Sequence, residues 1–133
     1  MPADERARHL AVVAARAAAD KKAEEIVALD VSERLVLTDA FVVASGATDR
    51  QVRAIVDGVE EALHGEGAKA MRKEGVTEAH WVLLDYGDII VHVQQTEDRE
   101  FYALERLWKD CPVIELPADL HGPSEEDDAG ASA

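Results

Sequence analysis

Two apolar runs separated by a short polar turn dominate the pattern of the chain. Residues 81–84 and 89–93 are rich in leucine, β-branched and aromatic side chains, which are typical of strands. Residues 85–88 (Asp-Tyr-Gly-Asp) supply the side chains of a reverse turn. Counting by two places Trp81 and Leu83 on one face of the first strand, yet apolar residues occur on both faces. The pattern predicts a hairpin inside a sheet that is covered on both sides.

Further strands are expected on either side of this hairpin. They cover residues 25–30, a broken second strand at residues 35–37 and 40–44, a short strand at residues 68–72, and an edge segment at residues 113–116.

Helical spacing appears in three places. Residues 3–22 form an alanine-rich pattern, and a last helix is expected to begin at Thr96 or Asp98 and to stop at Pro112. The strongest pattern begins with Thr48 as N-cap and ends near Gly65 or Gly67. Its apolar stripe is Val52, Ile55, Val56, Val59 and Leu63. The apolar face of the last helix is Phe101, Leu104, Leu107 and Trp108, and we expect Phe101, Tyr102, Leu104 and Trp108 to lie in the core.

This alternation of strands and helices predicts an α/β fold with a single mixed β-sheet flanked by helices. The 133 residues suit one domain, which we assign to residues 1–116. Residues 117–133 are acidic and poor in apolar side chains, so we expect a disordered tail.

Charge narrows the classes of partner. The chain has 28 acidic and 14 basic residues and a net charge of −14, which argues against broad nucleic-acid binding and favours a basic partner. The single cysteine, Cys111, fits a reducing compartment. No stretch resembles a signal peptide or a membrane span, so we expect a cytoplasmic protein with no membrane partner.

Candidate catalytic chemistry is weak throughout. Ser45-Gly46 precedes a helix N-terminus but lacks a phosphate-loop motif, and Asp85 and Asp88 are best explained as turn residues. The histidines have no metal-ligand spacing, and Cys111 has no activating neighbour in sequence. We expect no catalytic, cofactor or metal residue. Two alternatives stay open: an Mg²⁺-nucleotide enzyme of the nucleotidyltransferase type, in which Ser45-Gly46 would meet the two aspartates, and a self-associating homodimer.

Several segments combine unrelated residue types in a fixed order and at fixed spacings along the chain. They are Leu29-Asp30-Val31, Thr38-Asp39-Ala40-Phe41, Ser45-Gly46 with Arg50-Gln51-Val52, Glu74-Gly75, residues 81–93, and Arg99-Glu100-Phe101-Tyr102-Ala103-Leu104-Glu105-Arg106-Leu107-Trp108. This combination resembles the Iojap or RsfS family of ribosomal silencing factors over about residues 5–110. The acidic tail is expected to lie outside the family pattern.

The resemblance implies a domain similar in fold to nucleotidyltransferases but without enzymatic activity or cofactor. It also implies binding to a small, basic β-barrel protein on the subunit-joining face of the large ribosomal subunit. Occupying that face would block the small subunit and repress translation under nutrient limitation; homodimers are a further possibility. The contact residues that it implies are Trp81, Leu83, Asp85 and Tyr86, with Asp88, Lys73 and Glu74 at the edge.

Overall fold

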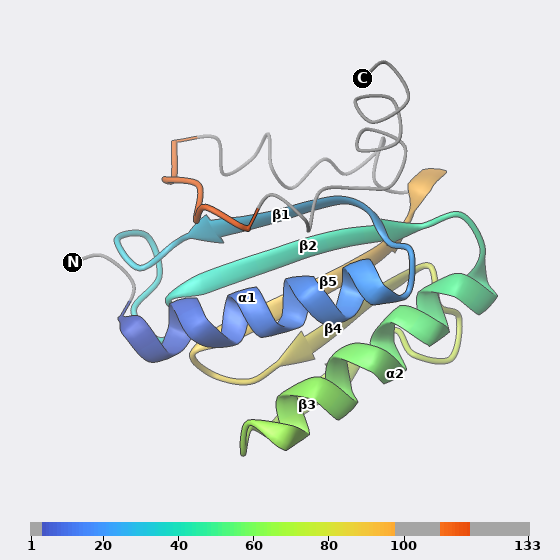
Figure 1. Cartoon of the computed structure of the whole chain (residues 1–133), viewed down its shortest axis with the longest axis horizontal. Helices are drawn as coiled ribbons and strands as arrows, with labels where there is room; N and C mark the ends of the chain where they lie inside the picture. Colours follow the sequence, from blue (N-terminus) through green and yellow to red (C-terminus); the bar gives the residue numbers. More distant parts are fainter. Residues whose placement is uncertain (1–3, 98–109, 118–133) are drawn as a thin grey trace.

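The structure of the protein is a computed structural model that describes residues 4–97 and 110–117. Within these residues the chain forms two helices and one five-stranded sheet (Figure 1). The elements in order are α1 (Glu5–Asp20), β1 (Glu24–Asp30), β2 (Ala40–Gly46), α2 (Asp49–Gly65), β3 (Arg72–Glu74), β4 (Trp81–Asp85) and β5 (Ile89–Gln95).

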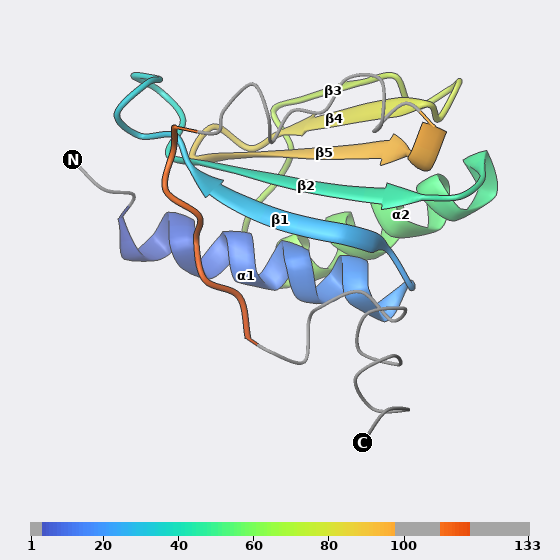
Figure 2. The ribbon, with the colours of Figure 1, turned by 90° about the horizontal axis from the view of Figure 1, so that it is seen from above.

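The strands lie in the order β1-β2-β5-β4-β3. β2 and β5 are parallel, and every other neighbouring pair is antiparallel, so the sheet is mixed. Seen along the sheet, α1 and α2 both lie on the same side of it (Figure 2). The predicted fold class, a single mixed sheet with flanking helices, is confirmed.

Both helices begin with a side-chain cap and bury one face. Asp4 accepts a hydrogen bond from the backbone N–H of Ala7 at 2.7 Å, and Thr48 accepts one from that of Gln51 at 3.1 Å. All five residues of the predicted α2 stripe are buried. The α1 face consists mainly of alanines, whose small side chains let the helix lie close to the sheet. The main core therefore lies between the two helices and one face of the sheet.

The predicted hairpin is confirmed as β4 and β5, but the two strands are covered differently. Most of β5 is buried on both faces, as a central strand should be. In β4, however, buried and partly exposed residues alternate. The difference follows from position, because β4 has only the three-residue edge strand β3 beyond it.

Two predicted strands need correction. Residues 35–37 form a loop, in which Val36 and Leu37 are 96% and 84% exposed. The Asp30 carboxylate accepts hydrogen bonds from the backbone and hydroxyl of Ser32, which starts a turn, and β2 begins only at Ala40. The apolar pattern alone could not separate an exposed loop from a strand.

The strand expected at residues 68–72 begins later. Gly67 takes a positive φ of 81°, and the Ala68 N–H then donates a hydrogen bond to the carbonyl of Leu63 at the end of α2. Pairing with β4 starts at Arg72, so the strand covers Arg72–Glu74.

The expected edge segment is confirmed in part. Val113 forms an antiparallel bridge with Leu29 of β1, and Ile114 is buried. Most of the expected last helix, with its four core residues, lies outside the described residues, as do residues 118–133 of the expected tail.

Candidate interaction surface

The two faces of β4 differ in what covers them. Val82 and Leu84 point into the core beneath the helices and are buried. Trp81, Leu83 and Asp85 therefore lie on the other face of the sheet, and each is partly exposed. Cross-strand pairing puts two β3 side chains beside them. We call this side of β3 and β4, which faces away from α1 and α2, the open face; it consists of Arg72, Glu74, Trp81, Leu83 and Asp85.

Trp81 is held from the side by the neighbouring strand. Its indole Nε1–H donates a hydrogen bond to Nδ1 of His92 in β5 at 3.2 Å, with ring centroids 6.2 Å apart. His92 in turn meets the ring of Phe41 in β2 edge-on, at 5.0 Å and 69°. Burial of His92 lowers its pKa to about 4, so the imidazole is neutral at pH 7 and its Nδ1 can accept the bond.

The loop before Trp81 is closed by backbone contacts. Ala79 N–H bonds the carbonyl of Gly75 at 2.9 Å, and Gln95 N–H bonds that of His80 at 2.8 Å. Arg53 of α2 reaches the carbonyl of Thr77 at 2.6 Å. These bonds fix where β4 begins, and hence where Trp81 stands.

Charges on the open face are partly paired with one another. The Arg72 guanidinium lies 3.1 Å from the carboxylate of Glu74 and 3.8 Å from that of Asp85. The second oxygen of Asp85 accepts a hydrogen bond from the Gly87 N–H at 2.8 Å. Sequence reasoning missed Arg72, because its place between two acids depends on the register of β3 against β4. The alternation of Arg72 and Glu74 was the available signal.

Other implied contact residues lie elsewhere. Lys73 forms an ion pair with Glu60 of α2 at 3.0 Å, on the helix side of the sheet. Tyr86 lines a pocket of about 430 Å³ against α2. Asp88 is exposed in the turn, where its carbonyl accepts from the Asp39 N–H at 2.8 Å. Of the seven residues implied, the structure therefore brings Trp81, Leu83, Asp85 and Glu74 together on one face and separates the other three from them.

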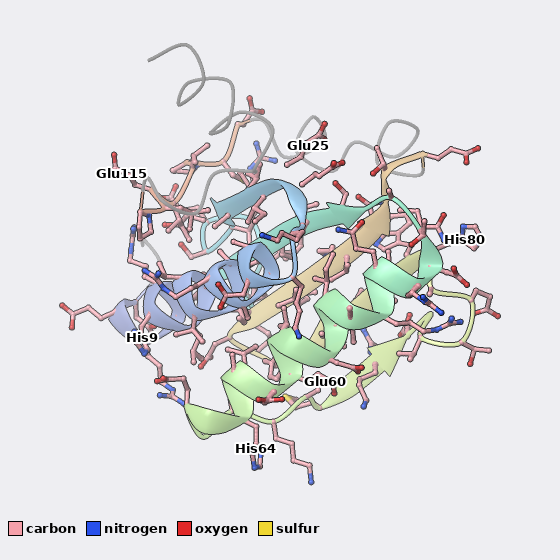
Figure 3. All side chains as sticks on the ribbon, turned by 45° about the vertical axis from the view of Figure 1, so that its right-hand side comes forward. His9, Glu25, Glu60, His64, His80 and Glu115 are labelled. Carbon is pink, nitrogen blue, oxygen red and sulfur yellow. The ribbon has the colours of Figure 1, made fainter. Side chains whose placement is uncertain are left out.

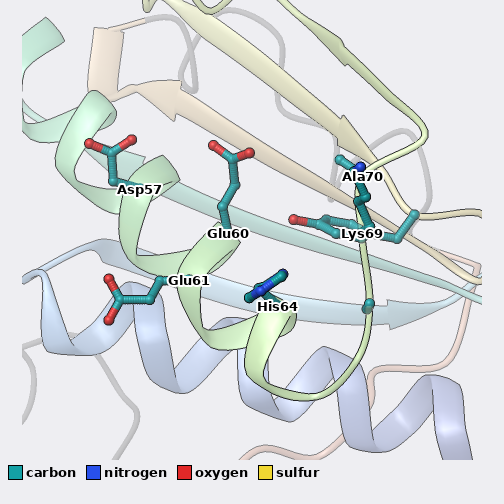
Figure 4. Close-up of a pocket in the computed structure, with 8 residues that line it drawn as sticks. Asp57, Glu60, Glu61, His64, Lys69 and Ala70 are labelled. Atoms are coloured by element: carbon teal, nitrogen blue, oxygen red, sulfur yellow. The ribbon is translucent and has the colours of Figure 1, made fainter.

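The pocket beside Tyr86 is lined by polar and acidic side chains together with two alanines. Glu60 and His64 project from α2 (Figure 3), and Lys69 approaches from the following loop (Figure 4). Burial, with a smaller contribution from Glu60, raises the pKa of Tyr86 to about 12. The phenol is therefore uncharged at pH 7. Across the described residues no cluster of three or more metal-binding side chains is present.

The groups required for a nucleotide site lie far apart. Ser45 pairs with Gln94 near one end of β5, whereas Asp85 pairs with Ile90 near the other. Four residues of strand separate these positions, or roughly 13 Å. The Ser45 hydroxyl also donates to the carbonyl of Glu24 at 3.0 Å. Ser45-Gly46 and the turn aspartates do not form one site in this structure.

Comparisons with known proteins agree on one family. The family model described as "Ribosomal silencing factor during starvation" (RsfS) matches residues 4–133. The match includes the acidic tail, so the expectation that the tail lies outside the family pattern is wrong. In residues 4–97 and 110–117, no helix has the length and apolar character needed to cross a membrane.

Individual relatives span most of the chain. Ribosomal silencing factor RsfS of Bacillus subtilis is 40% identical over 104 residues, which are 78% of this chain and 88% of the relative. That of Halalkalibacterium halodurans is 38% identical over 109 residues, or 82% and 93% of the two chains. A crystal structure of a Chromobacterium violaceum protein has 35% identity and a TM-score of 0.73, covering 76% of this chain and 84% of that one. The chain belongs to the RsfS family of ribosomal silencing factors, as the resemblance predicted.

Proposed function

We propose that this protein silences ribosomes by occlusion. It binds a protein on the subunit-joining face of the large ribosomal subunit and sterically blocks the small subunit, which represses translation under nutrient limitation. The mechanism makes and breaks no covalent bond and needs no cofactor. The family name supports a ribosomal target, and the open face supports a protein partner.

The observation that carries the proposal is the exposure of Trp81 and Leu83 on the open face. Neither residue packs beneath α1 or α2, although both are large and apolar. Tryptophan is enriched among the residues that dominate binding energy at protein interfaces, especially within a polar rim. Arg72, Glu74 and Asp85 supply such a rim. Tyr86, Asp88 and Lys73 remain proposed contacts at the periphery.

The proposed partner is a basic β-barrel protein. The net charge of −14 attracts a positively charged surface over a distance of several ångströms, which mainly raises the association rate. The direct contribution of the open face is smaller, since Arg72 already neutralises part of its charge. Raising the salt concentration should therefore slow association more than it speeds dissociation.

The test is sedimentation of the purified protein with separated large and small ribosomal subunits. We expect co-migration with the large subunit alone, and fewer joined ribosomes when both subunits are present. Trp81→Ala should weaken large-subunit binding by at least about tenfold. Val36→Ala is the matched control, because it truncates an apolar side chain that is 96% exposed in the loop between β1 and β2, outside the five residues of the open face.

Each part of the proposal has its own contrary result. A folded protein that binds neither subunit would contradict ribosome silencing. Normal binding by folded Trp81→Ala would leave silencing intact and remove the open face as the contact surface. A homodimer formed through the open face would appear as a concentration-dependent mass in light scattering that Trp81→Ala abolishes.

A further inference from the structure

His92 is a buried polar residue whose side chain is directed at one neighbour. It is 5% exposed, lies on the same face of the sheet as Leu83, and pairs with that residue across β4 and β5. Its Nδ1 accepts the indole N–H of Trp81, whereas its Nε2 has no hydrogen-bond partner in the described part of the chain. The imidazole therefore makes one side-chain hydrogen bond there, and that bond goes to Trp81.

Burying such a side chain has an energetic cost. An imidazole loses its hydrogen bonds to water on burial, and among residues 4–97 and 110–117 only one of its two nitrogens regains a partner. An apolar side chain of similar volume would fill the same space without that cost. Stability of the fold alone does not account for a histidine at this position.

The contacts of His92 instead account for the orientation of Trp81. The Phe41 ring meets the imidazole on one side and the Trp81 indole on another, so the three rings bridge β2, β5 and β4. An indole at a partly exposed position has several rotamers available, and a hydrogen bond to its single N–H selects among them. A side chain that is already ordered before binding loses less entropy when the complex forms.

We propose that His92 is a positioning residue for Trp81: its Nδ1 holds the indole in the orientation in which the open face binds its partner. This inference rests on the proposed function, because it concerns the affinity of that same surface. His92 acts through Trp81 and need not touch the partner.

The experiment compares two substitutions at His92 in the full chain. Asparagine carries an acceptor oxygen close to the place of Nδ1, so His92→Asn keeps the bond, whereas His92→Leu fills the space without an acceptor. Binding to purified large subunits should weaken about fivefold in His92→Leu and change less than about twofold in His92→Asn. Urea unfolding of each variant establishes that it is folded under the binding conditions.

A second background separates positioning from general packing. Trp81→Phe keeps an aromatic ring but removes the N–H, and should itself weaken binding by about fivefold. In that background His92→Leu should cause no further loss, since the bond it breaks no longer exists. Trp81→Phe alone also provides a test should His92→Leu fail to fold: binding equal to that of the unmodified protein would overturn the inference.

Different results would overturn the proposed function and the positioning role of His92. If the unmodified protein does not bind the large subunit, or Trp81→Ala binds normally, the open face is not the binding surface and the inference falls with it. If Trp81→Ala loses binding but folded His92→Leu retains it, only the positioning role is overturned. Equal losses in His92→Leu and His92→Asn, repeated in the Trp81→Phe background, would assign His92 to packing and overturn the inference as well.

Discussion

A Cβ atom added to Gly75 would lie 2.1 Å from the carbonyl oxygen of Trp81. Real Cβ atoms do not approach a backbone oxygen so closely. Gly75 also has a φ of +78°, which side chains other than glycine rarely adopt. Two independent constraints thus require glycine where the chain turns between β3 and β4, directly against the residue that the open face presents.

We therefore expect Gly75→Ala to lower the free energy of unfolding by about 2 kcal/mol or more, through backbone strain and displacement of Trp81. Gly65→Ala is the matched control. It lies at the end of α2, where an added Cβ meets nothing within 4 Å, so it should be neutral or slightly stabilising. Urea unfolding measures both, and equal effects in the two variants would contradict the close approach.

The pH dependence of stability should carry a component from His92. Its pKa is lowered from 6.5 to about 4 in the folded protein. Between these values the unfolded chain binds a proton at this histidine and the folded chain does not, so stability falls as the pH falls. The loss should reach about 3 kcal/mol near pH 4 and be absent above pH 6.5.

The comparison of the protein with His92→Asn isolates that component, because the carboxylates titrate in both. As the pH is lowered from 7 toward 4, the protein with His92 should lose more unfolding free energy than His92→Asn does, so the stability of the variant rises relative to that of the unmodified protein. A difference that stays constant over this range would show that His92 is not buried as described.

Gln94 is buried in β5, yet neither atom of its side-chain amide has a hydrogen-bond partner within the described residues. Replacing it by methionine, which has a similar shape, should raise the free energy of unfolding by about 1–2 kcal/mol. Gln51→Met is the control, because the Gln51 amide accepts from Ala47 N–H and donates to the Lys22 carbonyl, both within 2.9 Å. Gln51→Met should lower the free energy of unfolding, because it removes both bonds. A lower free energy of unfolding in Gln94→Met as well would contradict the prediction.

Tyr86 should ionise unusually late in an alkaline titration followed by phenolate absorbance. Burial and then Glu60 raise its pKa to about 12, so its folded form remains protonated where an ordinary tyrosine ionises. A Tyr102→Phe background leaves Tyr86 as the only phenol. Adding Glu60→Gln should lower the pKa of Tyr86 only in part, because burial is the larger cause. If Glu60→Gln returned the pKa of Tyr86 to its ordinary value of 10, Glu60 and not burial would be the larger cause of the shift.

Much of the fold follows from local sequence. The α2 stripe, the Thr48 cap and the hairpin depend on side chains within a few positions of one another, so spacing alone predicts them. The open face follows in part from the same counting, since alternate residues of a strand share a face. The period of two alone therefore places Trp81 and Leu83 on the same face of β4.

The remaining features depend on which strands become neighbours. Lys73 and Glu74 are adjacent in sequence, but Lys73 forms an ion pair with Glu60 of α2 and Glu74 lies on the open face. The register of β3 against β4 decides which of the two residues faces which side. The bond from Trp81 to His92 likewise joins residues that are 11 positions apart. At Val36 and Leu37 the local pattern is misleading, because their apolar side chains predict a strand but are exposed in a loop. The chain turns there after the Asp30 carboxylate accepts a hydrogen bond from the Ser32 N–H.

The edges of the sheet limit how two copies of this chain can meet. β3 has three residues, all charged and exposed, and such short charged edges resist backbone pairing with another strand. The opposite edge, β1, is already occupied near Leu29 by the segment that contains Val113. A continuous sheet running from one copy into the next is therefore disfavoured at both ends. A dimer that formed through the open face would compete with the proposed partner for Trp81 and Leu83.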